Sequence, residues 1–295
     1  MDKKLALVIE DDAYLSDVFS EAVKKAGYNV EVLTDGKAAR ARLLAVAPDV
    51  VILDLHLPHV SGADLLTEIL KDPIPVFPLP NLVMFPRAVQ FLHLFEERYR
   101  TMMSDLLEHP ADRRFIAMAL LKSGYESRYH TNHAEIHPTL CVGLVVRHEV
   151  LEDGTYNLIL RGICRATVRQ EDRDGPYRMA YLQPLRDAGV GAGFDEADAR
   201  LRLGRVLMEP SFDQIAQAQS CRAWVRSDLG VSDLVDLFAF HLLPDSEVEL
   251  KQLILDQPDL PARVDMLTNN LMALARTIQV ARSRWQSWPP REFAN

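Results

Sequence analysis

Residues 75–100 read PVFPLPNLVMFPRAVQFLHLFEERYR, and this stretch decides the fold. Four prolines, at positions 75, 78, 80 and 86, lie within its first twelve residues. Proline fixes φ and lacks an N–H donor, so we predict that this run neither continues a helix nor forms a central strand. Apart from Asn81, the residues between the prolines are apolar, unlike those of a solvated linker. We therefore predict short strands at a sheet edge, buried on one side, followed by a helix from about Glu96.

Three segments of the chain resemble the Lon N-terminal domain, the substrate-recognition module of the ATP-dependent protease Lon. They are PLPNLVMFPRAVQFLHLFEERYR at 78–100, HPTLCVGLVVRHEVLEDGTYNLILRGICRATV at 137–168 and LKQLILDQPDLPARVDMLTNNLMALA at 250–275. The resemblance covers residues 76–274. It implies a small β-barrel of the PUA type followed by a helical part. It also implies a binding module, because the chain stops before the ATPase and peptidase domains of full-length Lon would begin.

Pattern and turn chemistry predict the elements of this second part. Apolar strands are expected at 114–121, 139–148, 156–161 and 166–169, with a hairpin turn at Asp153-Gly154 and a break at Gly162. From residue 195 the composition becomes helical, with a break near Pro210 and helices at 232–242, 246–255 and 260–282. We expect a β-barrel over 76–190, a helical part over 191–283 and a flexible tail over 284–295.

The N-terminal residues 1–73 alternate between buried strands and helices. Strands are expected at 5–9, 29–33 and 50–54, with helices from 13 to Gly27, over 37–47 and over 62–70. The first helix carries apolar residues on one side, at 15, 18, 19, 22 and 23. This order predicts a parallel α/β sheet with its chemistry at the carboxyl ends of the strands.

Three carboxylates fall at those carboxyl ends, namely Asp11, Asp12 and Asp54. Carboxylates crowded together repel one another, and Mg²⁺ relieves that repulsion through oxygen ligands. The alternative is that strand-end acids cap helices and face water. Three acids at the ends of two strands favour the metal site.

Residues 4–72 resemble the first part of a bacterial response-regulator receiver domain, on the motifs LVIEDD and DVVILDLHLPHVSG. The resemblance implies that Asp11 and Asp12 help to hold Mg²⁺, with Leu55 beside the metal, and that a histidine kinase phosphorylates Asp54. A complete receiver has five strands, with Ser or Thr ending the fourth and Lys ending the fifth. After KDPIPV this chain turns into FPLPNLVMFP, so those two residues have no counterpart. Half of such a sheet leaves an apolar edge and face exposed.

Composition excludes several classes of protein. The net charge of −9 argues against a nucleic-acid binder. The three cysteines form no CxxC pair, which favours reduced thiols over a disulfide framework or a zinc knuckle. The sequence lacks the apolar run that a membrane span needs and a signal-peptide pattern. We therefore expect a cytoplasmic protein with neither nucleic acid nor membrane as its partner.

Catalytic motifs are missing from the sequence. It contains neither G-x-S-x-G nor G-x-x-x-x-G-K-[ST], so we expect no enzymatic activity and no ATP site. His130, His133 and His137, with Glu135, offer metal-binding residue types without the helical H-E-x-x-H spacing. We favour solvated loop histidines over a metal site there.

Two functions follow from these patterns. The first is a non-enzymatic module that binds unfolded or degron-bearing proteins through adaptable apolar residues, for which the candidates are Met84, Phe85, Phe95 and Tyr99. The second is a phosphorelay response regulator in which phosphorylation of Asp54 controls a Lon-like output domain.

Overall fold

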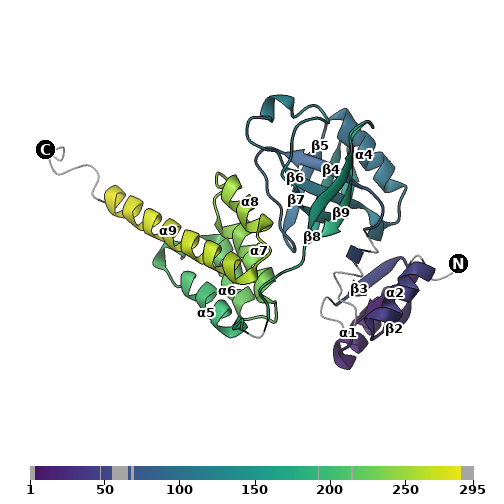
Figure 1. The fold of residues 1–295 in the computed structure, drawn as a ribbon, viewed down its shortest axis with the longest axis horizontal. Coiled ribbons are helices and arrows are strands. Elements are labelled where there is room, and N and C mark those ends of the chain that lie inside the picture. Colours follow the sequence, from purple (N-terminus) through teal and green to yellow (C-terminus); the bar gives the residue numbers. More distant parts are fainter. Residues whose placement is uncertain are drawn as a thin grey trace. The chain divides into compact units, whose positions relative to one another are not determined.

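A computed structural model of the chain describes residues 4–46, 48–54, 66–67, 70–191, 193–213 and 215–286 (Figure 1). It divides into two compact units. One unit joins Met1–Pro80 to Val89–Arg186, and the other joins Asn81–Ala88 to Asp187–Asn295. The second unit is therefore discontinuous in sequence. Most of the predicted helix at 62–70 and most of the predicted tail lie outside the described residues.

The N-terminal part is a three-stranded parallel sheet with the order β2-β1-β3, which confirms the predicted α/β arrangement. Its strands pack Leu7 and Ile9 of β1 into a small core with Ala39. In chain order its elements are β1 (Leu5–Ile9), α1 (Ala13–Lys25), β2 (Asn29–Leu33), α2 (Gly36–Ala45) and β3 (Val50–Leu53).

The apolar side of α1 is largely exposed. Leu15 and Val18 keep 42% and 46% of their surface accessible, whereas Ser16 and Ser20 are the buried residues of the helix. In the described residues β3 pairs with β1 alone, so the sheet has no fourth strand beyond it. The expectation of an exposed apolar face on an incomplete sheet is met.

The second part is built on a six-stranded sheet with the order β5-β8-β7-β6-β4-β9. An additional pairing between β8 and β9 curls this sheet toward a barrel. The helix α4 (Glu97–Leu107) follows β5 close to the predicted start. The strands are β4 (Ile74–Leu79), β5 (Val89–Leu94), β6 (Phe115–Leu120), β7 (Thr139–Val150), β8 (Tyr156–Asp172) and β9 (Arg178–Pro184), and short 3₁₀ turns lie at Ala111–Arg113 and Glu126–Arg128.

The edge position predicted for the proline-rich strand is wrong. β4 lies inside the sheet, parallel to β6 on one side and antiparallel to β9 on the other. The two neighbours are staggered along it, so Pro75 pairs only with β9 and Pro78 only with β6. Each proline therefore borders a single partner strand, which limits the ladder hydrogen bonds that its missing N–H can cost.

The strand break predicted at Gly162 is also wrong. β8 runs without interruption through that position, and the register with β7 shifts between Val142 and Gly143. The partner of Gly143 is Gly162 and the partner of Val142 is Cys164, so Ile163 is the extra residue of a bulge. The hairpin between β7 and β8 turns at Gly154, whose φ is +76°. That turn was predicted.

The apolar core of the barrel extends into the residues ahead of β4. Leu66 and Leu70 are buried in one cluster with Ile74, Val76 and residues of the other strands. Gln183 of β9 donates its side-chain N–H to the hydroxyl of Thr67 at 3.4 Å. Residues that a receiver would use in its own third helix thus pack on the barrel.

The C-terminal unit is helical, as predicted. Arg263 lies fully buried in it and donates hydrogen bonds to Asp187, Ser232 and Asp236. No helix among the described residues has both the length and the hydropathy of a membrane span. The helices are α5 (Glu196–Val206), α6 (Ala216–Val225), α7 (Val231–Leu242), α8 (Val248–Asp256) and α9 (Leu260–Gln286), with a 3₁₀ turn at Pro210–Phe212.

Candidate functional site

An acidic cluster lies at the carboxyl ends of β1 and β3. Glu10 and Asp11 follow β1, and Asp54 follows β3. The N–H of Asp54 donates to the carbonyl of Ile9 at 2.8 Å, which continues the strand pairing to the end of the sheet. One carboxylate oxygen from each of the three acids lies within 4.8 Å of the others. The sheet therefore gathers three oxygen ligands of the kind that a hard divalent cation requires.

Electrostatics at this cluster disfavour three bare negative charges. Burial raises the pKa of Glu10 above its usual value, and the charges of Asp54, Asp11 and Asp12 raise it further. The N–H of Asp12 donates to the Glu10 carboxylate at 3.2 Å and acts in the opposite direction. A cation would lower the energy of the ionised form of all three carboxylates.

The cluster contains Asp11 and Asp54 of the predicted set Asp11, Asp12, Asp54 and Leu55. Asp12 caps α1 instead, because its carboxylate accepts a hydrogen bond from the N–H of Leu15 at 2.9 Å. Glu10 lies in the cluster, and it was not predicted as a candidate ligand from the sequence. The signal was available, since an Asp directly before a helix favours the N-cap position. Leu55 lies outside the described residues.

The histidine-rich loop assembles no comparable site. Among the described residues the acidic cluster is the one group of three or more metal-ligating side chains that converge. Glu135 instead faces cations, with Arg173 at 3.4 Å and Lys122 at 3.9 Å. The loop histidines His130, His133 and His137 are not drawn together around it.

Three of the four predicted partner-binding residues belong to the core. Met84, Phe85 and Tyr99 are fully or almost fully buried, and the Tyr99 ring packs edge-on against Phe77 at 4.3 Å between centroids. Such side chains are not placed to contact a partner. Phe95 is 64% exposed and is the one of the four that lies on the surface.

Phe95 belongs to an exposed apolar strip along β5, which we call the β5 face. The side chains of β5 alternate, so Val89, Phe91 and His93 point outward while Leu94 is buried. Phe91 is 70% exposed. The His93 ring stacks on Phe95 with centroids 6.0 Å apart and bonds to Asn157 at 2.9 Å. The β5 face consists of Val89, Phe91, His93 and Phe95, together with the half-buried Ile159 opposite Phe91.

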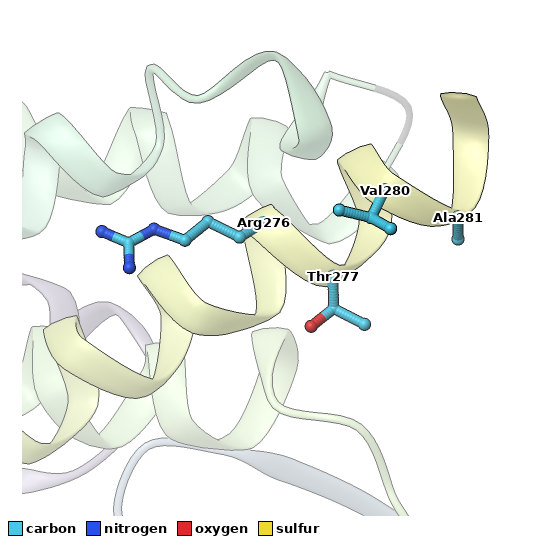
Figure 2. Close-up of a pocket in the computed structure, with 4 residues that line it drawn as sticks. All are labelled: Arg276, Thr277, Val280 and Ala281. Carbon is cyan, nitrogen blue, oxygen red and sulfur yellow. The ribbon is translucent and has the colours of Figure 1, made fainter. Parts of the chain in front are cut away.

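Two surface depressions are weaker candidates for a functional site than the acidic cluster and the β5 face. Figure 2 shows one of about 360 Å³ whose lining residues Arg276, Thr277, Val280 and Ala281 all come from α9. The Thr277 hydroxyl donates back to the carbonyl of Ala273, so this depression presents neither a nucleophile nor a ligand set. A second one, of about 410 Å³, lies between α4 and the β7–β8 hairpin. There Arg100 donates to the carbonyl of Gly154 at 2.8 Å and holds the hairpin in place.

Comparison with known families decides the identity of the larger part of the chain. The family described as the ATP-dependent protease La (LON) substrate-binding domain matches residues 73–272. The chain belongs to this family. Its fold agrees with that of a solved Lon domain, the N-terminal domain of the Mycobacterium avium complex Lon protease, which is 14% identical. The alignment covers 68% of this chain and 98% of that one, with a TM-score of 0.51.

The N-terminal part of this Lon-domain protein matches a second family. The response-regulator receiver domain matches residues 6–120. RpaA of Synechocystis, named a DNA-binding dual master transcriptional regulator, is 31% identical over 134 residues, which cover 44% of this chain and 54% of RpaA. The chemotaxis protein CheY of Thermotoga maritima is 33% identical over 69 residues, or 23% of this chain and 58% of CheY. The chain thus spans little more than half the length of these relatives.

The two family matches overlap, and the structure assigns the shared residues. Both matches include residues 73–120, where the structure has β4, β5, α4 and β6. Those three strands pair within the six-stranded sheet of the barrel. In the described residues the receiver-like sheet keeps three strands, and the Lon-type domain takes over from there.

Proposed function

We propose that this chain binds unfolded or degron-bearing proteins through the β5 face. The observation that carries the proposal is the exposure of Val89 and Phe91 on β5 and of Phe95 directly after it, with His93 between the two phenylalanines and stacked on Phe95. Large exposed apolar side chains that adjoin one another mark interaction surfaces more often than single ones do. The membership in a substrate-binding family agrees with a protein as the ligand. The proposed activity is binding, and it involves no chemical step.

The test is fluorescence anisotropy of a labelled, permanently unfolded polypeptide titrated with the full chain. We expect saturable binding with a Kd of about 50 µM or tighter, roughly −6 kcal/mol. Phe91→Asp and Phe95→Asp should each weaken it about tenfold, because a carboxylate replaces an apolar contact. Met208→Asp is the matched control, since Met208 is an exposed apolar residue of the helical unit. No binding by the wild type, or equal loss in the control, would refute the proposal.

The acidic cluster favours a second function, phosphorylation at Asp54. Glu10 and Asp11 would hold Mg²⁺ beside Asp54, and a bound ion would supply positive charge there while an Asp54 carboxylate oxygen attacks phosphorus. With acetyl phosphate as the donor, the new bond joins Asp54 to phosphorus and acetate leaves. Intact-mass analysis should then show one added phosphoryl group that requires Mg²⁺ and is lost in Asp54→Asn. An unchanged mass for the wild type would end this idea.

A further inference from the structure

The outer side of β5 is an open sheet edge. In the described residues β5 pairs with β8 and with no other strand. Natural proteins protect such edges with lysine, proline, bulges or covering elements. The strand sequence VQFLHL carries neither lysine nor proline, and its register with β8 is unbroken from Val89 to Leu94. Within the part of the chain that the structure describes, this edge has no second paired strand, no lysine, no proline and no bulge.

The hairpin beside β5 shows which backbone groups face the open side. The N–H of Leu151 donates to the carbonyl of Thr155, which closes the β7–β8 hairpin. Because hydrogen-bonded and non-bonded pairs alternate in antiparallel strands, the pairs at 149:157 and 147:159 are hydrogen-bonded toward β7. The residues between them on β8, at 156, 158 and 160, then bond toward β5.

Those three residues of β8 pair with Leu94, Leu92 and Gln90. The backbone groups of Val89, Phe91 and His93 therefore point away from the sheet. One observation supports this directly, since the Gln90 side chain donates to the carbonyl of Phe91 at 2.9 Å, a bond that an added strand would have to displace. The same three residues carry the exposed side chains of the β5 face. Backbone donors, acceptors and apolar side chains thus alternate along one unpaired edge.

Charge near this edge is positive at one end. Arg161 pairs with Val89 across β5 and β8, so the two side chains lie on the same face of the sheet. Arg161 is exposed and has no ion-pair partner among the described residues. At the other end of β5, His93 pairs with Asn157 of β8, and Asn157 pairs with Glu149 of β7, which is acidic. A ligand that lies along the whole of β5 therefore meets the positive charge of Arg161 at the end beside Val89.

We infer that β5 takes up an extended polypeptide as an added strand, which rests on the proposed binding of unfolded proteins and names its mode. The ligand is a segment with apolar side chains at alternate positions and an acidic residue at the end beside Arg161. Main-chain hydrogen bonds to the edge provide affinity, and alternate side chains against Phe91 provide selectivity.

The probe is a fluorescein-labelled peptide of about eight residues, a typical strand length, with Val, Leu or Phe at alternate positions and one terminal Asp. Its matched partner has the same side chains and N-methyl groups on the amides of alternate residues, in two versions of opposite phase. Full-length protein is titrated with each peptide. We expect one N-methylated version to bind about tenfold or more weakly, through lost hydrogen bonds. Equal binding of all versions would overturn strand addition while leaving client binding intact.

Protein variants test the same edge from the other side. His93→Pro removes the outward N–H while the ladder to β8 stays, because proline is tolerated on an edge strand. His93→Ala removes the side chain and keeps that N–H. We expect the proline variant to lose about tenfold in affinity and the alanine variant about threefold or less. Equal affinities of the two variants would contradict the inference, and the N-methylated peptides decide the matter should His93→Pro unfold.

The preference for an acidic residue beside Arg161 is tested by exchanging the charges of the protein and the peptide. Arg161→Glu should weaken the aspartate peptide, and replacement of that aspartate by arginine should restore binding to the variant. Failure of the swap would refute the acidic preference. Light scattering of the free chain gives the remaining outcome. A dimer that His93→Pro dissociates, and that the peptide does not disrupt, would assign the edge to a second copy and overturn the inference.

Discussion

The most deeply buried charged residue of the barrel is Arg178, and its hydrogen-bond partners explain how a charge is accommodated there. Its guanidinium donates to the carboxylate of Glu171 and to the carbonyl of Ala134. Arg173 donates to the same carboxylate at 3.0 Å and faces Glu135. Burial by itself raises the pKa of Glu171, but the hydrogen bonds from Arg173 and Arg178 outweigh it and hold that pKa below its usual value. The Glu171 carboxylate is therefore ionised at neutral pH.

Glu171→Ala should lower the free energy of unfolding by about 3 kcal/mol, because it leaves Arg178 buried without a counter-charge. Urea unfolding measures this loss. Glu152→Ala is the control, since Glu152 lies exposed in the hairpin loop and should change stability by about 0.5 kcal/mol or less. A loss in Glu171→Ala no larger than in the control would show that the pair does not stabilise the barrel.

The same carboxylate gives a pH dependence. Because its pKa is lowered on folding, the unfolded state binds protons more readily as acid is added. The stabilisation is complete above the ordinary pKa of about 4.5 and is lost as the pH falls through the folded value. Unfolding of the wild type between about pH 6 and 3 should therefore show a steeper loss of stability than unfolding of Glu171→Gln. Parallel curves would contradict the assignment.

At the scale of elements, local sequence signals predicted turns and helices. The order of the strands in the sheet depends on pairing between distant segments, which those signals do not contain. The β7–β8 turn, α7 and α9 follow from Asp153-Gly154 and from apolar periodicity. The interior position of β4 depends on staggered neighbours that are distant in sequence. Tyr99 and Phe95 are both aromatic residues in an apolar stretch of the sequence. Tyr99 lies on the buried side of α4, whereas Phe95 follows the end of β5 and is exposed, and the sequence alone does not separate these two environments.

The incomplete receiver-like sheet predicts an unusual tolerance in α1. Val18→Lys should leave the protection of the β1 amides against hydrogen exchange within about 0.5 kcal/mol of the wild type, because Val18 is already half exposed. Leu7→Ala should lower that protection by about 2 kcal/mol or more, because Leu7 is fully buried. Equal damage from both variants would mean that a partner covers the apolar side of α1 in solution.

At the scale of the whole molecule, the boundary between the two families does not coincide with the packing. The Lon-family match begins at residue 73, but the barrel core already includes Leu66 and Leu70. Leu66 and Leu70, from the end of the receiver-like segment, thus form part of the core of the barrel. Excision at the family boundary would remove core residues from the barrel.

Leu70→Ala should destabilise the barrel by about 3 kcal/mol, as expected for a buried leucine replaced by a smaller residue. Leu201→Ala is the matched control, because Leu201 is exposed on α5. Urea unfolding followed by the circular dichroism of the β-sheet measures both. An unchanged midpoint for Leu70→Ala would show that residues 66–70 do not contribute to the barrel in solution.

The discontinuous helical unit has a consequence for synthesis on the ribosome. Val83, Met84 and Phe85 are buried and belong to the unit whose other residues begin at Asp187. At roughly 5–20 residues per second, about 100 further residues take on the order of 5–20 s to emerge. During that interval the nascent chain displays an apolar trio that its own later helices have yet to cover. Chaperones that scan emerging polypeptides therefore have a window in which to engage this segment.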